Sequence, residues 1–321
     1  MKTNRIGRTD VAVTAISFGC SGLGNLYRKL EEGAAEAVLA RAWNHGIRYF
    51  DTAPHYGRGL SEQRLGAFLR GRNREDYVVS TKVGRLLSPG PHLPEADGFV
   101  EPLPNAVRYD YTGDGIEASF EQSCQRLGTS RIDIVFVHDI GSYTHGADNA
   151  RHMADLLGSG LDRLERLKRQ GRIGAIGLGV NENEVCVDIL RERPLDVILL
   201  AGRWTLLDRS AETALVPLCH EHGTSLVLGG IFNSGILATG AKPGATYDYA
   251  PASREILEQV TRLQNRAAAV GVSLATAALR FAMTRTEAAS VLIGTSNVAS
   301  LDRNLDAINA PWPATADAVL V

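Results

Sequence analysis

The feature that most constrains the fold of this chain is an eightfold alternation of short apolar segments with longer segments of helical character. The short segments are apolar on both faces, which is typical of buried parallel strands. We predict strands near residues 16–19, 47–51, 77–81, 132–137, 173–179, 196–200, 225–229 and 290–293. Helices are expected near residues 33–45, 61–70, 114–127, 154–170, 181–191, 210–222, 253–270 and 297–308, with an added helical segment over 273–284. This pattern predicts an α/β fold, a (β/α)8 TIM barrel, as a single domain over residues 1–321.

Three segments lie outside the alternation. Residues 3–14 alternate weakly around Gly7-Arg8-Thr9-Asp10, which indicates an N-terminal β-hairpin. Ser88 to Asp110 is rich in proline and glycine and has no period, and Gly240 to Pro251 is a shorter stretch after the seventh strand. We expect both as long β→α loops at the C-terminal face of the barrel. The first either covers a substrate or is a tolerated insertion.

Charge and composition exclude several classes of function. The formal net charge is −2, with both signs interspersed, and this gives no electrostatic reason to bind nucleic acid or an anionic membrane. No apolar run approaches the roughly 20 residues of a membrane span, and the N-terminus lacks a signal pattern. Cys20, Cys124, Cys186 and Cys219 have no paired spacing. We therefore expect a cytoplasmic protein with reduced thiols and no metal site.

Four polar residues fall at or just beyond the carboxyl ends of predicted strands: Asp51, Tyr56, Lys82 and His138. A tyrosine with a pKa of about 10 is a poor acid or base at neutral pH, but a nearby ammonium favours its phenolate. A carboxylate would hold that lysine, and a histidine could orient a hydroxyl or carbonyl oxygen. Taken singly, Asp51 could be a strand-end cap, Lys82 a solvated loop lysine and His138 a core histidine. Together they predict a proton-transfer unit for carbonyl–alcohol interconversion.

The glycine-rich segment from Ile173 to Gly179 is similar to the start of a dinucleotide-binding fingerprint. Glu182 stands where the third glycine should be, and no acidic residue follows at the expected spacing. We interpret this segment as a packed barrel strand with small residues.

The motifs Phe50 to Gly57, Ser80-Thr81-Lys82 and Val137-His138-Asp139 closely resemble the aldo-keto reductase superfamily, and the similarity runs the whole chain. The resemblance implies an NAD(P)-dependent oxidoreductase that uses no metal. It maps the catalytic tetrad of the family onto Asp51, Tyr56, Lys82 and His138. Tyr56 would donate or accept the proton while hydride moves to or from the nicotinamide.

The resemblance also implies a cofactor site with unusual features. Asn181 matches the asparagine that holds the nicotinamide carboxamide, whereas Val180, Ala201 and Gly229 stand where serine, glutamine and a stacking aromatic are usual. Trp204 is a candidate substitute surface. The cofactor-binding residues implied are Asn181, Gly230, Phe232, Asn233, Ser234, Gly235, Leu237, Gly294, Thr295, Ser296, Ser300 and Asn304.

The same resemblance indicates NAD rather than NADP. Members that prefer NADP carry a lysine and an arginine for the 2′-phosphate, where this chain has Gly294 and Ser300. Without those two cations the extra phosphate would be poorly compensated. Arg303 lies close by in the sequence and is the one counter-indication.

Residues 229–235 and 196–207 resemble one branch of the family, which contains NAD-dependent aldose 1-dehydrogenases of the D-threo-aldose, L-fucose and L-galactose types and a pyridoxal 4-dehydrogenase. The expected reaction is oxidation of the anomeric carbon of an aldose to a lactone, by a monomer or homodimer. Alternatives are oxidation of pyridoxal to 4-pyridoxolactone, general aldehyde or ketone reduction, and a cofactor-binding regulatory subunit. Candidate substrate contacts are Tyr27, His55, Trp204 and the loop over 84–110.

Overall fold

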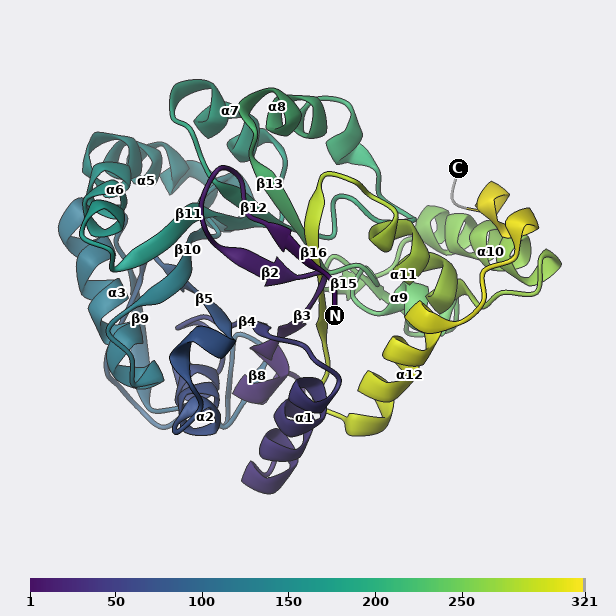
Figure 1. The fold of residues 1–321 in the computed structure, drawn as a ribbon, viewed down its shortest axis with the longest axis horizontal. Helices are drawn as coiled ribbons and strands as arrows, with labels where there is room; N and C mark the ends of the chain where they lie inside the picture. The colour runs from purple at the N-terminus through teal and green to yellow at the C-terminus, as the bar shows by residue number, and fades with distance from the viewer. Residues whose placement is uncertain (320–321) are drawn as a thin grey trace.

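A computed structural model describes residues 1–319 and shows a closed barrel of eight parallel strands, which confirms the predicted fold (Figure 1). The eighth barrel strand pairs with the first, through Val291 to Ile16 and Gly294 to Gly19, and this closes the ring. The barrel strands are β3 (Ile16–Gly19), β4 (Tyr49–Asp51), β5 (Val78–Val83), β10 (Ile132–His138), β11 (Ile173–Val180), β12 (Val197–Ala201), β13 (Ser225–Gly229) and β16 (Ala288–Gly294).

The barrel is filled by side chains, so it is a core and not a channel. Successive residues of a strand point to opposite faces, and one face of each barrel strand points inward. The inner cluster includes Tyr49, Phe136 and Leu199. The predicted N-terminal hairpin, β1 (Thr3–Arg5) with β2 (Ala12–Thr14), crosses one end of the barrel, and Ile6 and Val13 join the inner cluster from there (Figure 1).

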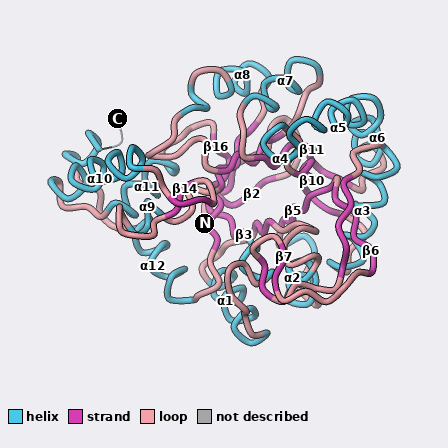
Figure 2. The backbone as a smooth tube through the Cα atoms, turned by 180° about the vertical axis from the view of Figure 1, so that it is seen from behind, coloured by secondary structure: helices cyan, strands magenta, loops and turns pink. Residues whose placement is uncertain are grey.

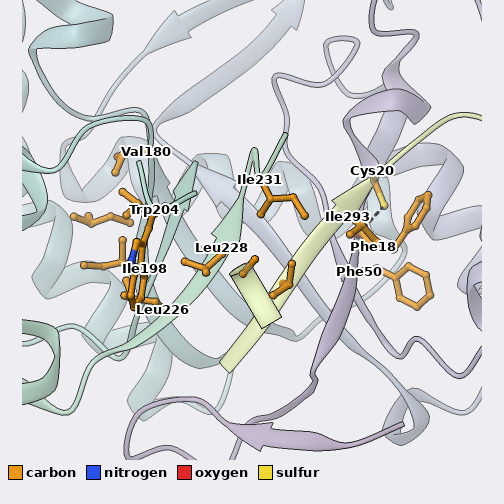
Figure 3. Close-up of a cluster of buried hydrophobic side chains, with 14 of the residues drawn as sticks. Phe18, Cys20, Phe50, Val180, Ile198, Trp204, Leu226, Leu228, Ile231 and Ile293 are labelled. Carbon is orange, nitrogen blue, oxygen red and sulfur yellow. Dashed lines mark hydrogen bonds between the residues drawn. The ribbon is translucent and has the colours of Figure 1, made fainter. Parts of the chain in front are cut away.

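Helices surround the barrel and bury its outward-facing side chains. Phe18, Phe50, Ile198, Leu228 and Ile293 belong to this outer core (Figure 3). The helices are α1 (Glu32–Asn44), α2 (Leu60–Leu69), α3 (Gly113–Leu127), α6 (Leu161–Arg169), α7 (Glu184–Glu192), α8 (Leu215–His222), α10 (Arg254–Ala269), α11 (Leu274–Met283) and α12 (Val298–Asn309). Within the described residues, no single helix is long and apolar enough to span a membrane; α10 and α11 pass such a test only as a pair bent by 92°.

Several predicted helices begin later or are interrupted. The helix expected over 154–170 consists of α5 (Asn149–Asp155), a π-helical turn (Leu156–Gly160) and α6. The wide turn lies beside Tyr111, and a Cβ at Gly160 would come within 2.4 Å of the Tyr111 carbonyl oxygen, so this close approach needs a glycine. The helix expected from residue 210 starts as a 3-10 turn (Ser210–Glu212), and α8 proper begins at Leu215.

The segment that we expected as an aperiodic loop, Ser88 to Asp110, instead contains short β-strands. The strand β6 (Arg85–Pro89) pairs antiparallel with β9 (Asn105–Tyr109), and β7 (Glu95–Ala96) pairs with β8 (Phe99–Val100). Sequence periodicity missed these strands because they are two to five residues long and lie between prolines. The tight turn at Asp97 and Gly98 has positive φ at both residues, 55° and 80°, as a two-residue hairpin requires.

Smaller elements stand around the end of the barrel opposite the N-terminal hairpin (Figure 2). They include α4 (Ser142–His145), α9 (Ile236–Thr239) and a hairpin of β14 (Thr246–Tyr247) with β15 (Ala250–Pro251). The remaining 3-10 segments are Cys20–Gly24, Arg74–Asp76, Gly146–Asp148 and Ala314–Val319. The β→α connections at this end of the barrel therefore carry α4, α9 and the β14–β15 hairpin.

Candidate active site

A buried ion pair joins two neighbouring strands at this end of the barrel. Lys82 Nζ lies 2.7 Å from Asp51 Oδ2, and the two side chains are 2% and 1% exposed. Ser80 Oγ donates to Asp51 Oδ1 at 2.7 Å. Asp51 and Lys82 each stand two residues after an inward-facing position of their strand, so period-two alternation directs both into the barrel. Burial raises the pKa of Asp51, and the charge of Lys82 opposes that effect.

Tyr56 completes this pair from the loop after β4. Lys82 Nζ donates to Tyr56 Oη at 3.0 Å and to the Thr52 carbonyl oxygen at 2.9 Å, so with Asp51 its three donors are all engaged. Burial raises the pKa of Tyr56, while the nearby Lys82 lowers it; the net direction is upward. We expected Lys82 to lower this pKa, and its contribution has that sign, but desolvation of the phenol outweighs it.

His138 ends β10 and faces Tyr56. The two rings are perpendicular, with centroids 6.1 Å apart. Burial lowers the pKa of His138 well below its usual value, and the charges of Arg85 and Lys82 act in the same direction. The imidazole is therefore neutral at physiological pH. Its Nδ1 is buried and has no hydrogen-bond partner within residues 1–319.

His55, a predicted substrate contact, lies in the same cleft. Its ring centroid is 5.8 Å from that of His138 and 5.3 Å from that of Phe99. Burial lowers the pKa of His55 to about 3, with further lowering by Arg85 and Lys82. Phe99 comes from β8, and its ring is 6.1 Å from that of Tyr56. The β-structure after Lys82 therefore contributes directly to the cleft.

Sequence reasoning missed two charged residues of this cleft, Asp139 and Arg85. Arg85 forms a close ion pair with Asp139, and His138 Nε2 lies 3.3 Å from Asp139 Oδ2. The Asp139 side chain is 16% exposed. A signal was present, because Asp139 directly follows His138 and Arg85 comes three residues after Lys82, each where a barrel strand ends.

The segment after β16 has the features of a phosphate site. A Cβ at Gly22 would lie 3.3 Å from Ser296 Cβ, so the two loops are in close contact. Arg28 donates to Ser296 Oγ at 2.7 Å and 3.2 Å. Asn297 caps α12 by accepting from the Ser300 amide at 3.0 Å. A capped helix start with an adjacent guanidinium fits the pyrophosphate of a dinucleotide.

The other predicted cofactor residues divide into accessible and structural ones. Asn233 accepts from Thr205 Oγ1 at 2.6 Å and donates to the Gly202 carbonyl oxygen at 3.0 Å, so its amide holds two loops together. Leu237 is fully buried in the outer core, and Phe232 packs against that core. Accessible positions along the two connections are Gly230, Ser234, Gly235, Gly294, Thr295, Ser296, Ser300 and Asn304.

Asn181 lies at the end of a barrel strand, whereas Trp204 is buried in the outer core. The Asn181 carbonyl oxygen accepts from Arg203 Nε at 2.7 Å at the end of β11. Trp204 is 4% exposed, and its Nε1 donates to Glu212 at 2.9 Å. Figure 3 shows its ring beside Ile198 and Leu226 in the helix-facing core. The structure therefore does not bring Trp204 into the cleft, where we expected it as a substrate contact and as a substitute for the stacking aromatic.

The glycines of the Ile173–Val180 strand serve packing. A Cβ at Gly177 would lie 1.8 Å from the Val197 carbonyl oxygen, and one at Gly179 would lie 3.3 Å from Lys82 Cε. Gly179 thus leaves room for the lysine stem. All four cysteines are buried and free, and burial raises the pKa of the Cys20 thiol well above its usual value, so this thiol is not activated.

Comparison with known proteins agrees with this geometry. The model of the Aldo/keto reductase family matches residues 15–316. The chain belongs to the aldo-keto reductase family. It is 39% identical to a D-threo-aldose 1-dehydrogenase from Pseudomonas sp, over 97% of this chain and 95% of that protein. It is 40% identical to a pyridoxal 4-dehydrogenase from Microbacterium luteolum, over 94% of this chain and 91% of the relative.

A solved structure leads to the same conclusion. The holo form of an aldo-keto reductase from Bacillus halodurans superposes with a TM-score of 0.78 at 26% identity, covering 100% of this chain and 95% of that one. As an aldo-keto reductase, this protein is an oxidoreductase that acts on small molecules with a nicotinamide cofactor.

Proposed function

We propose that this aldo-keto reductase oxidises the anomeric carbon of an aldose to the lactone, with NAD as cofactor. The observation that carries the proposal is the contact of Tyr56 Oη with Lys82 Nζ at 3.0 Å, in a cleft that also holds Asp51 and His138. Binding alone does not require a tyrosine held by a buried ammonium. The similarity to a D-threo-aldose 1-dehydrogenase supports the choice of substrate class.

The proton chemistry follows from these contacts. Tyr56 removes the proton of the anomeric hydroxyl, and Lys82 stabilises the phenolate that this requires. His138, neutral because it is buried, positions the substrate oxygen by a hydrogen bond. Asp51 keeps Lys82 charged and in place. Bound NAD supplies the acceptor for the hydride that leaves the same carbon.

Several residues fit the cofactor. Asn181 at the end of β11 would hold the nicotinamide end, and the Gly294, Thr295 and Ser296 segment would hold the phosphates. Gly294 and Ser300 carry no charge, which supports NAD over NADP. Arg303 donates to Ser300 Oγ at 2.8 Å, and Arg28 contacts Ser296. Variants of these two arginines therefore test the preference for NAD over NADP.

Oxidation of pyridoxal to its lactone is the second candidate. Pyridoxal in its cyclic form is also a hemiacetal, so the same proton transfer by Tyr56 would serve it. The 40% identity to a pyridoxal 4-dehydrogenase favours this candidate over general aldehyde or ketone reduction. A cofactor-binding regulatory subunit is the alternative from another class, and an assembled Tyr56–Lys82 pair argues against it.

The test is the initial rate of reduced cofactor formation on L-fucose, D-arabinose, L-galactose, L-rhamnose and pyridoxal, each with NAD and with NADP. Turnover of a sugar with NAD is the expected result. Turnover of pyridoxal alone would establish the second candidate. If all five are inert and NADPH-dependent reduction of simple aldehydes is found instead, both the substrate class and the cofactor preference are wrong.

A further inference from the structure

Tyr111 is a fully buried tyrosine that contacts the backbone of His138. Its hydroxyl donates to the His138 carbonyl oxygen at 2.7 Å, and His145 Nε2 lies 2.9 Å from the same hydroxyl oxygen. Tyr111 precedes α3, His138 ends β10, and His145 lies in α4 (Figure 2). The predicted substrate contact Tyr27, by contrast, is 68% exposed at the same end of the barrel. Tyr111 therefore acts on the protein and not directly on a ligand.

The hydrogen bonds at the Tyr111 hydroxyl have only one consistent direction. A phenol has one proton and a carbonyl oxygen can only accept, so Tyr111 donates its proton to His138. Burial raises the pKa of Tyr111, so the phenol keeps that proton at physiological pH. The Tyr111 oxygen then accepts from His145, whose Nε2 must carry the N–H. Burial lowers the pKa of His145 to about 4, and the charges of His152 and Arg85 act in the same direction, so the donor is a neutral imidazole.

The bond from Tyr111 lies where β10 leaves the sheet. The pairing of β10 with β5 ends at Val137 and Val83, one residue before His138. The residue after His138, Asp139, has a left-handed φ of 46°, so the chain turns sharply there. Left-handed conformations persist where the surrounding contacts fix them. The hydroxyl thus fixes the carbonyl between the regular strand and this turn.

The ring and the backbone of Tyr111 are also closely packed. A Cβ at Gly84 would lie 2.3 Å from Tyr111 Cε1, and Gly84 comes two residues after Lys82. A Cβ at Gly160, in the π-helical turn, would lie 2.4 Å from the Tyr111 carbonyl oxygen. π-Helical turns are frequent at functional sites. Tyr111 therefore packs against the end of β5 with its ring and bonds to the end of β10 with its hydroxyl.

We propose that Tyr111, oriented by His145, is a positioning residue for His138. Its hydroxyl holds the end of β10 so that the imidazole points at the substrate oxygen, and its ring sets the distance from that strand end to Lys82. The effect is largest when Tyr56 takes the substrate proton, because negative charge then develops on the oxygen that His138 binds. This inference rests on the role proposed for His138 in the oxidation and adds the residues that fix it.

The first experiment removes the hydroxyl and keeps the ring. For Tyr111→Phe, we expect kcat on the best substrate of the panel to fall about tenfold, the effect of a small misalignment. KM for NAD should stay within about twofold, because the lost hydrogen bonds belong to β10 and α4. Thr224→Val is the matched control, since Thr224 donates to the Leu195 carbonyl oxygen at 2.7 Å at the opposite end of the barrel, where β13 begins. This variant should lose as much thermal stability and keep the wild-type kcat.

A second variant tests the link through His145. His145→Phe removes the donor and keeps a ring beside Tyr109 and His152, whose ring centroids lie 4.8 Å and 4.4 Å away. We expect kcat to fall about threefold, the smaller effect of a lost neutral hydrogen bond behind the hydroxyl. The double variant should be no slower than Tyr111→Phe alone, because His145 acts through that hydroxyl. Additive losses would contradict this order of action.

A third measurement does not depend on turnover. NMR titration of isotope-labelled histidine gives the pKa of the His138 imidazole, with a His138→Asn variant to assign its signal. In the wild type, burial keeps this pKa well below its usual value. In Tyr111→Phe the pKa should rise toward about 6.5, because a loosened ring regains water, whereas Thr224→Val should leave it unchanged. The charged and titratable groups around the ring are the same in both variants: Lys82, Arg85, Asp139 and His55.

The outcomes distinguish this inference from the proposed function. Wild-type values of both kcat and the His138 pKa in Tyr111→Phe would make Tyr111 structural and overturn the inference. Equal losses of kcat in Tyr111→Phe and Thr224→Val would also overturn it, because lost stability would then explain both. A wild type that turns over no substrate of the panel contradicts the proposed function, and the titration still decides the role of Tyr111. If Tyr111→Phe does not fold, unchanged kcat and His138 pKa in His145→Phe overturn the inference.

Discussion

Lys82 Nζ lies 3.0 Å from Tyr56 Oη, although the two residues are 26 positions apart and belong to different segments. The lysine reaches the phenol because β4 and β5 are neighbours and Gly179 of β11 leaves space for the lysine stem. With Asp51 at 2.7 Å on the other side, the ammonium cannot move toward solvent without breaking a buried ion pair. Tyr56, the proposed acid–base group, is thus held by a buried ion pair.

Removal of the Tyr56 hydroxyl should abolish turnover. For Tyr56→Phe we expect kcat to fall by about 10²–10⁴, the usual contribution of a general acid or base. The affinity for NAD, measured by fluorescence titration, should be unchanged because the ring is retained. Tyr77→Phe, which changes a tyrosine directly before β5 at the other end of that strand, is the matched control and should be fully active. Retained turnover in Tyr56→Phe would contradict the mechanism.

Acid stability should depend on His55. Its pKa is about 3 in the folded protein and about 6.5 when unfolded, so the unfolded chain takes up a proton first as the pH falls. The contribution of neutral His55 to the free energy of unfolding is complete above pH 6.5 and is lost progressively as the pH falls toward 3. Between pH 6.5 and pH 4 the wild type should lose about 3 kcal/mol more unfolding free energy than His55→Asn.

Urea unfolding at a series of pH values measures this difference. His92→Asn, which changes an exposed histidine outside the cleft, is the control and should follow the wild-type profile. Parallel curves for wild type and His55→Asn would show that this imidazole is not desolvated in the folded protein.

Two arginines should act differently on cofactor binding. Arg28 contacts Ser296 at the phosphate segment, so Arg28→Gln should raise the dissociation constants of NAD and NADP together, each by about tenfold. Arg303 contacts Ser300, at a position that resembles the 2′-phosphate site, so Arg303→Gln should weaken NADP alone. Arg191→Gln, which changes an exposed residue in the last turn of α7, is the control. A loss specific to NAD in Arg28→Gln would contradict the phosphate assignment.

The glycine at position 177 should be required for folding. A Cβ there would lie 1.8 Å from a backbone oxygen of the next strand, and backbone yields less easily than a side chain. We expect Gly177→Ala to cost about 3 kcal/mol or more, seen as a lower melting temperature or as insoluble protein. Gly158→Ala, where nothing lies within 4 Å, is the matched control and should be neutral or stabilising. A stable Gly177→Ala protein would mean that β11 and β12 lie further apart.

Much of the barrel could be predicted from the sequence, because buried strands and amphipathic helices leave a periodic signal. Predicted strands such as 16–19 and 225–229 coincide with β3 and β13. The β6–β9 and β7–β8 pairs left no such signal, because their short strands are held by partners up to 24 residues away, as Arg85 is by Tyr109. Trp204 shows the same limit: its sequence position follows a barrel strand, but its indole turns into the outer core.

The sequence by itself determined which end of the barrel carries the residues that we propose to react. Asp51, Lys82 and His138 stand in register with inward-facing strand positions, and period-two alternation is a local property of the chain. Only the tertiary structure decided what surrounds them. The net direction of the Tyr56 pKa shift, the pairing of Arg85 with Asp139, and the approach of the Phe99 ring to Tyr56 all depend on groups that are distant in sequence. Desolvation and charge act through space, so their balance exists only once the barrel has closed.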